Sequence, residues 1–358
     1  MKRLLILSTA LAGLALPAAA QQITVLGWGG AYTVSQVEAY HKPFTAKTGI
    51  AVISADSDNP ATPIKAQVEA KNVSVDVASV EYADAVRLCD EGLLELIDPA
   101  ILTPAPDGTA ALDDFLPGAV TECFVATDVY STVLAYDTTK FPNGAPTKLA
   151  DFFDLEKFPG KRGMRKGAKV NLEMALMADG VPAAEVYSVL ATPEGVDRAF
   201  AKLGTIKSQI IWWEAGAQPP QLLADGEVTM SIAYNGRIFN AAVGDGKPFD
   251  IVWDGQVYEL EGWVIPKGAP NLQAALDFVA FSTGTEPLAK AAEWISYGPP
   301  RVSSGPLVGK FKDGTTDMAP HLPTTAANLT NALSSDLEFW VDRDGELNER
   351  FNAWLAAN

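Results

Sequence analysis

Segments with the apolar pattern of β-strands alternate with segments of helical periodicity along most of this chain. The first unit is a strand at 23–28, a turn at Gly29 and Gly30, and a helix at 32–47 that ends before Gly49. Later segments repeat this order, with strands expected at 50–54, 75–80, 210–213, 228–234 and 257–265, and helices at 63–71, 83–91, 195–203, 219–224, 272–282 and 287–295. Such alternation predicts an α/β protein.

The length of the chain predicts more than one domain. At about 150 residues per domain, 358 residues correspond to roughly two. Stretches rich in proline and glycine occur at 104–108, 142–146 and 298–306, but they have the length of loops rather than of linkers. We therefore expect two interleaved lobes that share strand crossings, an arrangement that suits closure around a ligand.

Residues 1–20 have the sequence of a secretory signal peptide. Lys2 and Arg3 precede an apolar run at 4–16, and small residues at 18–20 complete a cleavage site. The apolar run is too short to span a bilayer, although an uncleaved anchor is the alternative. The sequence therefore predicts an exported protein.

The charge balance excludes one large class of partners. The chain has 27 Lys and Arg against 44 Asp and Glu, so its formal charge is −17 before any signal peptide is removed. Such a surface repels phosphate backbones, and we therefore expect no nucleic-acid partner. It can instead attract cations.

The two cysteines, Cys89 and Cys123, are candidates for a disulfide bond because an exported chain reaches an oxidising compartment. Closing a loop of about 35 residues would stabilise the fold by roughly 3 to 4 kcal/mol. Two separately buried thiols are the alternative.

Motifs for catalysis and metal binding are absent from the sequence. The two histidines, His41 and His321, lie outside any zinc-binding motif, and there is no nucleophile elbow or Walker A loop. The turn at 27–30 lacks the third glycine of a dinucleotide-binding loop. We therefore expect no enzyme, no cofactor and no metal site. A secreted hydrolase that uses Glu259 and Glu261 as acid and base is the alternative.

Distinctive residues occur in five stretches of the chain, at 27–32, 42–50, 216–228, 233–237 and 262–270. Together these stretches resemble the periplasmic solute-binding proteins of ABC importers, in particular the spermidine/putrescine-binding branch. The resemblance implies a two-lobed type II periplasmic binding protein fold, with lobe 1 at 21–132 and 260–318 and lobe 2 at 133–259 and 319–358. It also implies a periplasmic monomer that delivers a small solute to an inner-membrane permease.

The resemblance and the position of strand ends together give nine candidate ligand-binding residues. They are Trp28, Tyr32, Glu81, Trp213, Tyr234, Arg237, Glu259, Glu261 and Tyr297. Aromatic faces attract ammonium groups, and Trp28 also ends the first strand, where open α/β folds bind ligands. Trp213 is chosen over Trp212 because it is nearer to the turn at 214–216, and the choice between the two stays open.

The charged candidates predict the two ends of a ligand. Glu259 and Glu261 point to the same face of a strand, where an ammonium group would relieve their repulsion. Arg237 replaces a small polar residue of the polyamine binders, and the basic stretch at 165–169 stands where they carry acidic residues. A guanidinium suits a carboxylate, so we expect a zwitterion such as γ-aminobutyrate. In the alternative, Arg237 forms an internal ion pair with Glu259.

Other ligands stay open at this point. A polyamine is favoured by the acidic charge and opposed by the basic stretch at 165–169. Ferric iron and thiamine are ligands of the same architecture, but iron would need clustered tyrosine oxygens, and no two of the nine tyrosines are adjacent.

Overall fold

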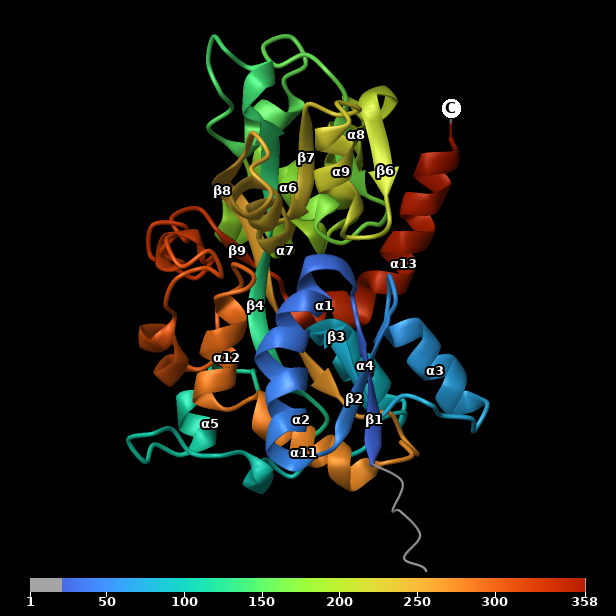
Figure 1. The fold of residues 1–358 in the computed structure, drawn as a ribbon. Coiled ribbons are helices and arrows are strands. Elements are labelled where there is room, and N and C mark those ends of the chain that lie inside the picture. Colours follow the sequence, from blue (N-terminus) through green and yellow to red (C-terminus); the bar gives the residue numbers. More distant parts are fainter. Residues whose placement is uncertain (1–20, 358) are drawn as a thin grey trace, which may run out of the picture.

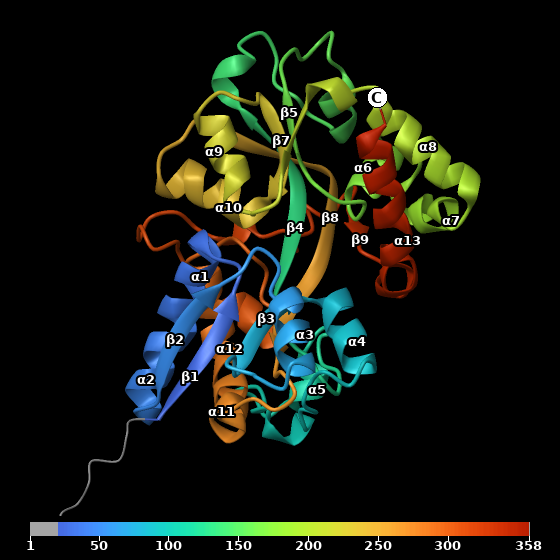
Figure 2. The ribbon, with the colours of Figure 1, turned by 90° about the vertical axis from the view of Figure 1, so that its right-hand side faces the viewer.

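The computed structural model describes residues 21–357, and the predicted signal peptide lies outside them. Two lobes are stacked one above the other, each with strands inside and helices around them (Figure 1). In a view turned by 90°, long strands run from one lobe into the other (Figure 2). Within 21–357, no helix is long and apolar enough to cross a membrane.

Lobe 1 is built on a parallel sheet of the N-terminal strands. β1 (Gln22–Gly27) lies between β2 (Ala51–Asp56) and β3 (Val77–Glu81). Its helices are α1 (Gly30–Gln36), α2 (Lys42–Thr48), α3 (Ala61–Glu69), α4 (Tyr82–Asp90), α5 (Ala111–Asp114), α11 (Leu272–Ser282) and α12 (Thr285–Ala292). A π-helical turn at Val37–His41 joins α1 to α2, so the helix predicted at 32–47 is one continuous helical segment.

Lobe 2 has a second parallel arrangement of strands. β5 (Arg162–Arg165) lies between β6 (Ile210–Trp213) and β7 (Met230–Tyr234). Its helices are α6 (Asn171–Ala178), α7 (Val186–Leu190), α8 (Pro193–Gly204), α9 (Gln218–Ala224), α10 (Asn235–Phe239) and α13 (Leu337–Ala356). The C-terminal helix α13 packs along one side of this lobe (Figure 2).

Two long antiparallel strands, β4 (Val125–Asp137) and β8 (Phe249–Val264), join the lobes. The strand order is β2-β1-β3-β8-β4-β7-β5-β6, and the short β9 (Leu333–Ser334) pairs with β8. The α/β class and the shared strand crossings are therefore confirmed. Sequence analysis found part of β8 but missed β4, because β4 is buried along its whole length and its buried polar residues obscure any alternation.

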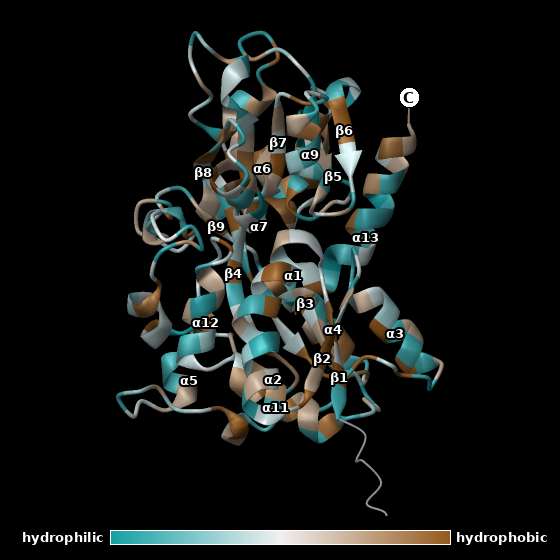
Figure 3. Cartoon of the chain, viewed as in Figure 1, coloured by the Kyte–Doolittle hydropathy of each residue, from teal (hydrophilic) through white to brown (hydrophobic). Residues whose placement is uncertain are grey.

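Each lobe has a hydrophobic core of its own. The core of lobe 1 comes from side chains within 23–126 and 263–291, and the main core of lobe 2 comes, apart from Ala83, from 134–257 and 333–351. The colouring by hydropathy shows hydrophobic residues in β6 and both hydrophilic and hydrophobic turns along α13 (Figure 3). Because the cores are separate, the two lobes are joined mainly through the crossing strands.

Cys89 and Cys123 form a disulfide bond in lobe 1, with an S–S distance of 2.06 Å. The bond closes a loop with a sequence separation of 34 residues. Replacing both cysteines by serine should therefore lower the free energy of unfolding by roughly 3 to 4 kcal/mol. Denaturant unfolding at pH 7 measures this loss, and dithiothreitol should destabilise the wild type but not the double variant. Equal unfolding midpoints for the two proteins would contradict the prediction.

Candidate ligand-binding site

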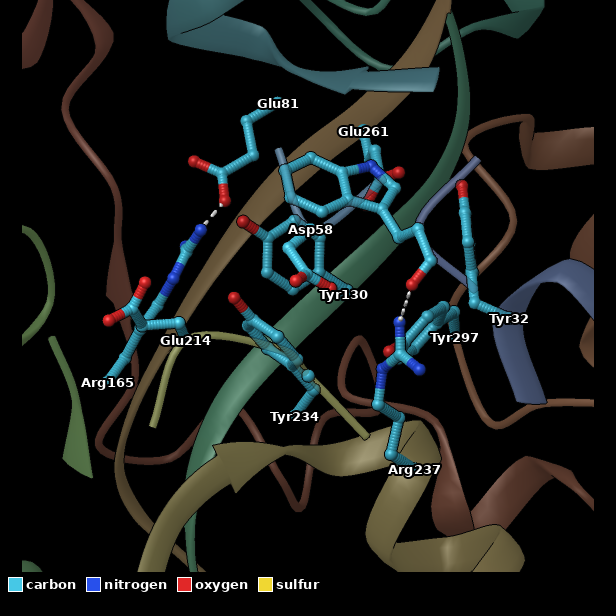
Figure 4. A pocket seen from close by; sticks show the side chains of 12 residues that line it. Tyr32, Asp58, Glu81, Tyr130, Arg165, Glu214, Tyr234, Arg237, Glu261 and Tyr297 are labelled. Atoms are coloured by element: carbon cyan, nitrogen blue, oxygen red, sulfur yellow. Dashed lines mark hydrogen bonds and ion pairs between the residues drawn. The ribbon is translucent and has the colours of Figure 1, made fainter. Parts of the chain in front are cut away.

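A cavity of about 360 Å³, counting the solvent at its mouth, lies where the ends of strands from both lobes meet (Figure 4). It is lined by Trp28, Tyr32, Asp58, Glu81, Tyr130, Arg165, Glu214, Gly216, Tyr234, Arg237, Glu261 and Tyr297. Seven of the nine candidate residues are in this set, so the structure brings together side chains that are more than 200 positions apart in the sequence. Polar and aromatic side chains alternate around it, as in sites that orient a small solute.

Aromatic rings form the apolar walls of the cavity. The ring centroid of Tyr130, on β4, lies 5.5 Å from that of Tyr234 and 6.1 Å from that of Tyr297, which in turn lies 5.8 Å from Tyr32. Trp28 packs against the same cluster. Such walls can hold a short alkyl chain and stabilise a nearby cation. Tyr130 was not predicted, because β4 was missed.

Three carboxylates form a row across neighbouring strands. Glu261, on β8, stands opposite Glu81 on β3 and opposite Asp128 on β4 in the two antiparallel registers. All three side chains are buried. Like charges that are directly opposite destabilise a sheet, so the row needs compensating cations. Asp128 is a further residue that sequence analysis missed together with β4.

Cations from lobe 2 neutralise Glu81. Arg165 donates from Nη1 to Glu81 Oε1 at 2.9 Å, and Lys169 donates from Nζ to Oε2 at 2.9 Å. Burial alone would raise the pKa of Glu81, but Lys169 and Arg165 hold it at about 2. Arg165 lies over the ring of Trp28, at 6.0 Å from the centroid, and it lines the cavity. The basic stretch predicted at 165–169 therefore reaches the site.

Within residues 21–357, hydroxyl groups and not cations bind Glu261 and Asp128. Ser79 Oγ donates to Glu261, while Tyr32 Oη and Thr127 Oγ1 donate to Asp128 at 3.0 and 3.1 Å. Burial and the charge of Asp128 raise the pKa of Glu261 well above its usual range, and burial raises the pKa of Asp128 to about 7. Glu261 also faces the cavity. The ammonium group of a bound ligand could therefore supply the positive charge that Glu261 and Asp128 lack among residues 21–357.

Arg237 connects the two lobes. From the start of α10 it donates from Nη1 to the carbonyl of Gly29 at 3.0 Å and from Nη2 to the carbonyl of Trp28 at 3.1 Å. The side chain is 6% exposed, and its Nε is buried without a partner in the described part of the chain. Arg237 thus pairs with backbone carbonyls and not with Glu259, so the alternative of an internal ion pair is wrong.

Glycines permit this close contact between lobes. Gly29 and Gly30 have φ values of 72° and 59°, a region that favours glycine. A Cβ atom at Gly30 would lie 2.9 Å from Arg237 Nη1, and one at Gly216 would lie 2.8 Å from Arg237 Nε. The glycine pair seen in the sequence therefore has a packing role as well as a turning role.

Two of the nine candidates lie behind the cavity wall. Glu259 pairs with Lys169 at 2.7 Å and accepts a hydrogen bond from Tyr130. Trp213 is 1% exposed, and its ring centroid lies 5.6 Å from that of Tyr234, which it supports from behind. Neither side chain lines this cavity, but both line a smaller neighbouring one, so direct contact of Glu259 and Trp213 with the ligand stays a prediction. Both side chains bind other residues of the protein, and no sequence pattern predicted these contacts.

Potential metal ligands gather at one place in residues 21–357, at Cys89, Glu122 and Cys123. The disulfide bond occupies both sulfur atoms, so this group offers no metal site. Glu259 and Glu261, the acid and base of the hydrolase alternative, do not line a common cavity within the same residues.

Two lobes joined by crossing strands, with a small charged and aromatic cavity between them, define a solute-binding protein. The chain belongs to the bacterial extracellular solute-binding protein family, whose sequence model matches residues 39–328. A curated relative from Pseudomonas aeruginosa, named gamma-aminobutyric acid-binding protein, is 49% identical over 348 residues, which are 96% of this chain and 95% of the relative.

Solved structures agree with this assignment. The PBP MotA from A. tumefaciens B6, in complex with glucopine, has a TM-score of 0.84 and 29% identity, covering 94% of this chain and all of that chain. A structure described as the Atu4243-GABA receptor has a TM-score of 0.78 and 32% identity, covering 94% and 98%. The spermidine/putrescine protein PotD of Streptococcus pneumoniae, at 17% identity and a TM-score of 0.69, shares the fold. Family and fold together show that the chain is a bacterial extracellular solute-binding protein.

Proposed function

We propose that the protein binds γ-aminobutyrate or a closely similar ω-amino acid. The observation that carries the proposal is the charge arrangement of the cavity: Glu261 lacks a cation, while the guanidinium groups of Arg165 and Arg237 line the same space (Figure 4). A ligand with an ammonium group at one end and a carboxylate at the other would satisfy both. The relatives named for γ-aminobutyrate, at 49% and 32% identity, support this choice.

The carboxylate of the ligand is assigned to Arg165. Its Nη1 is bonded to Glu81, but its Nε and Nη2 donate to no group within residues 21–357. The terminal nitrogens of Arg237 are already bonded to Trp28 and Gly29, which leaves only its Nε. Arg165 therefore has the freer donors, and Lys169 can neutralise Glu81 while Arg165 turns towards the ligand.

The cellular setting of the proposal follows from export. We place the protein in the periplasm after cleavage of residues 1–20, as a monomer without a cofactor that delivers its ligand to an inner-membrane permease. The bodies proposed to close around the ligand are lobe 1 at 21–132 and 260–318 and lobe 2 at 133–259 and 319–358. The separate cores of the two lobes support these boundaries.

Calorimetric titration of the full mature chain tests the ligand. γ-Aminobutyrate should bind with one site per chain and at least 100-fold more tightly than putrescine, which also has four carbons but carries a protonated aminomethyl group where γ-aminobutyrate has its carboxylate. The reason is that the second ammonium would face Arg165 and Arg237. Tighter binding of putrescine, or no heat with γ-aminobutyrate, would contradict the proposal.

Arg165→Met tests the carboxylate end. The variant should lower the affinity for γ-aminobutyrate roughly 10- to 100-fold, because it removes a charge-assisted hydrogen bond that contributes about 1.5 to 3 kcal/mol. It should change the affinity for n-butylamine, which has no carboxylate, by less than threefold. Competition against γ-aminobutyrate measures the affinity for n-butylamine, which binds more weakly. An unchanged affinity for γ-aminobutyrate would remove Arg165 from this role.

A further inference from the structure

Glu261 and Asp128 form a buried acidic pair that has no counterion among the residues that the structure describes. They stand opposite each other in the β4–β8 register and are 6% and 7% exposed. Residues opposite each other in an antiparallel pair have Cβ atoms about 4.5 to 5.5 Å apart, so the carboxyl groups are neighbours. The nearby cations in the described chain pair with other carboxylates. Arg165 and Lys169 bind Glu81, and Lys169 also binds Glu259.

The surroundings of the pair contain further acids, neutral groups and two guanidinium groups at the cavity wall. These belong to Arg165 and Arg237, whose hydrogen bonds go to Glu81 and to the carbonyls of Gly29 and Trp28. The titratable groups that face it are Tyr32 and Tyr40 from the first helical segment, Glu81 from β3, Glu259 from β8, Tyr234 from the end of β7 and Tyr297 after α12. Asp128 Oδ1 has no hydrogen-bond partner in residues 21–357, and it borders a small cavity that also contains the unpartnered amide nitrogen of Gln36. Two full negative charges in this setting would repel each other without compensation.

We propose that Glu261 and Asp128 share one proton in the empty site and that the ammonium group of the ligand displaces it. This inference rests on the proposed function. The protonated pair and the ammonium ligand give a complex of the ionised pair with the ammonium, and the proton passes to the buffer. Each binding event therefore releases one proton, and no covalent bond of the ligand changes.

The pKa directions agree with this geometry. Burial raises the pKa of Asp128 to about 7, and burial together with Asp128 raises that of Glu261 well above its usual range, so the empty pair holds a proton at pH 6. An ammonium group beside the pair favours the ionised form and lowers both values. Below the pKa of the empty pair, the affinity should consequently rise about tenfold per pH unit, and it should level off above that pKa.

Titration of the full mature protein with γ-aminobutyrate at pH 6, in buffers with different ionisation enthalpies, counts the released protons. The slope of observed heat against buffer enthalpy should correspond to about one proton released by the wild type. Asp128→Asn should lower this number measurably, because the charge of Asp128 is, after burial, the second cause that raises the pKa of Glu261. The affinity of this variant should also depend less steeply on pH than that of the wild type.

Glu173→Gln is the matched control. Glu173 is also a buried carboxylate whose pKa burial raises to about 7, but it is bonded to Tyr187 and Trp340 within lobe 2, away from the cavity. This variant should release as many protons as the wild type. Binding of γ-aminobutyrate without proton release at pH 6 would overturn the inference and leave the proposed function standing. An absence of binding at every pH would overturn both.

Discussion

Glu261→Gln should weaken the binding of γ-aminobutyrate by roughly 100-fold or more at pH 8. Glu261 is the buried carboxylate that lines the cavity without a cation, and the substitution keeps its size while removing its charge. Loss of one partner of a buried ion pair costs about 3 to 5 kcal/mol, which corresponds to a loss of affinity by roughly 10² to 4 × 10³. Calorimetry or a competition assay on the folded variant measures the change.

Glu259→Gln provides the comparison for this prediction. Glu259 lies two residues away on the same strand, but its charge is already paired with Lys169 and it does not line the cavity. The affinity of this variant should stay within about fivefold of the wild type. Equal losses in the two variants would mean that the ammonium group lies between both carboxylates, as the sequence alone had predicted.

Much of the fold could be predicted because many of its helices and shorter strands have a hydrophobic pattern that is visible in the local sequence. The strand at 210–213 and the helix at 272–282 were predicted with the bounds that the structure shows, since short apolar runs and helical periodicity are readable without tertiary context. β4 could not be read in this way. It is buried on both faces, so polar residues such as Asp128 and Thr132 lie inside the protein and the pattern of period two is lost.

The site was predicted as a set of residues and not as a set of contacts. Trp28 was found because it ends the first strand, and Tyr234 and Glu261 were found through the family resemblance; all three line the cavity. The hydrogen-bond partners of Arg237 were not predicted, because they are backbone carbonyls 208 and 209 positions away. Every residue has such a carbonyl, so the sequence does not show which ones accept a bond. The pairing of Lys169 with Glu259 was missed for a related reason, since these residues are 90 positions apart and meet only once lobe 2 has folded.

Arg237→Met should weaken the binding of every ligand, with or without a carboxylate, by about 100-fold. The guanidinium of Arg237 joins lobe 2 to the carbonyls of Trp28 and Gly29 in lobe 1, so its hydrogen bonds form only when the lobes are together. Each bond from a charged donor contributes about 1.5 to 3 kcal/mol. Without them the closed arrangement is less populated, and the affinity falls by the same factor for γ-aminobutyrate and for n-butylamine.

The equal loss for the two ligands distinguishes lobe bridging from direct recognition. If Arg237 clamped the ligand carboxylate, as its sequence position first indicated, the variant would weaken γ-aminobutyrate and spare n-butylamine, which is the pattern expected here for Arg165→Met. X-ray scattering gives an independent measure, because the unliganded Arg237→Met protein should have a larger radius of gyration than the unliganded wild type. Arg237→Lys keeps the charge but has only one terminal nitrogen, so it can donate to one of the two carbonyls at full strength. Its ligand affinity and its radius of gyration should therefore lie between those of the wild type and Arg237→Met.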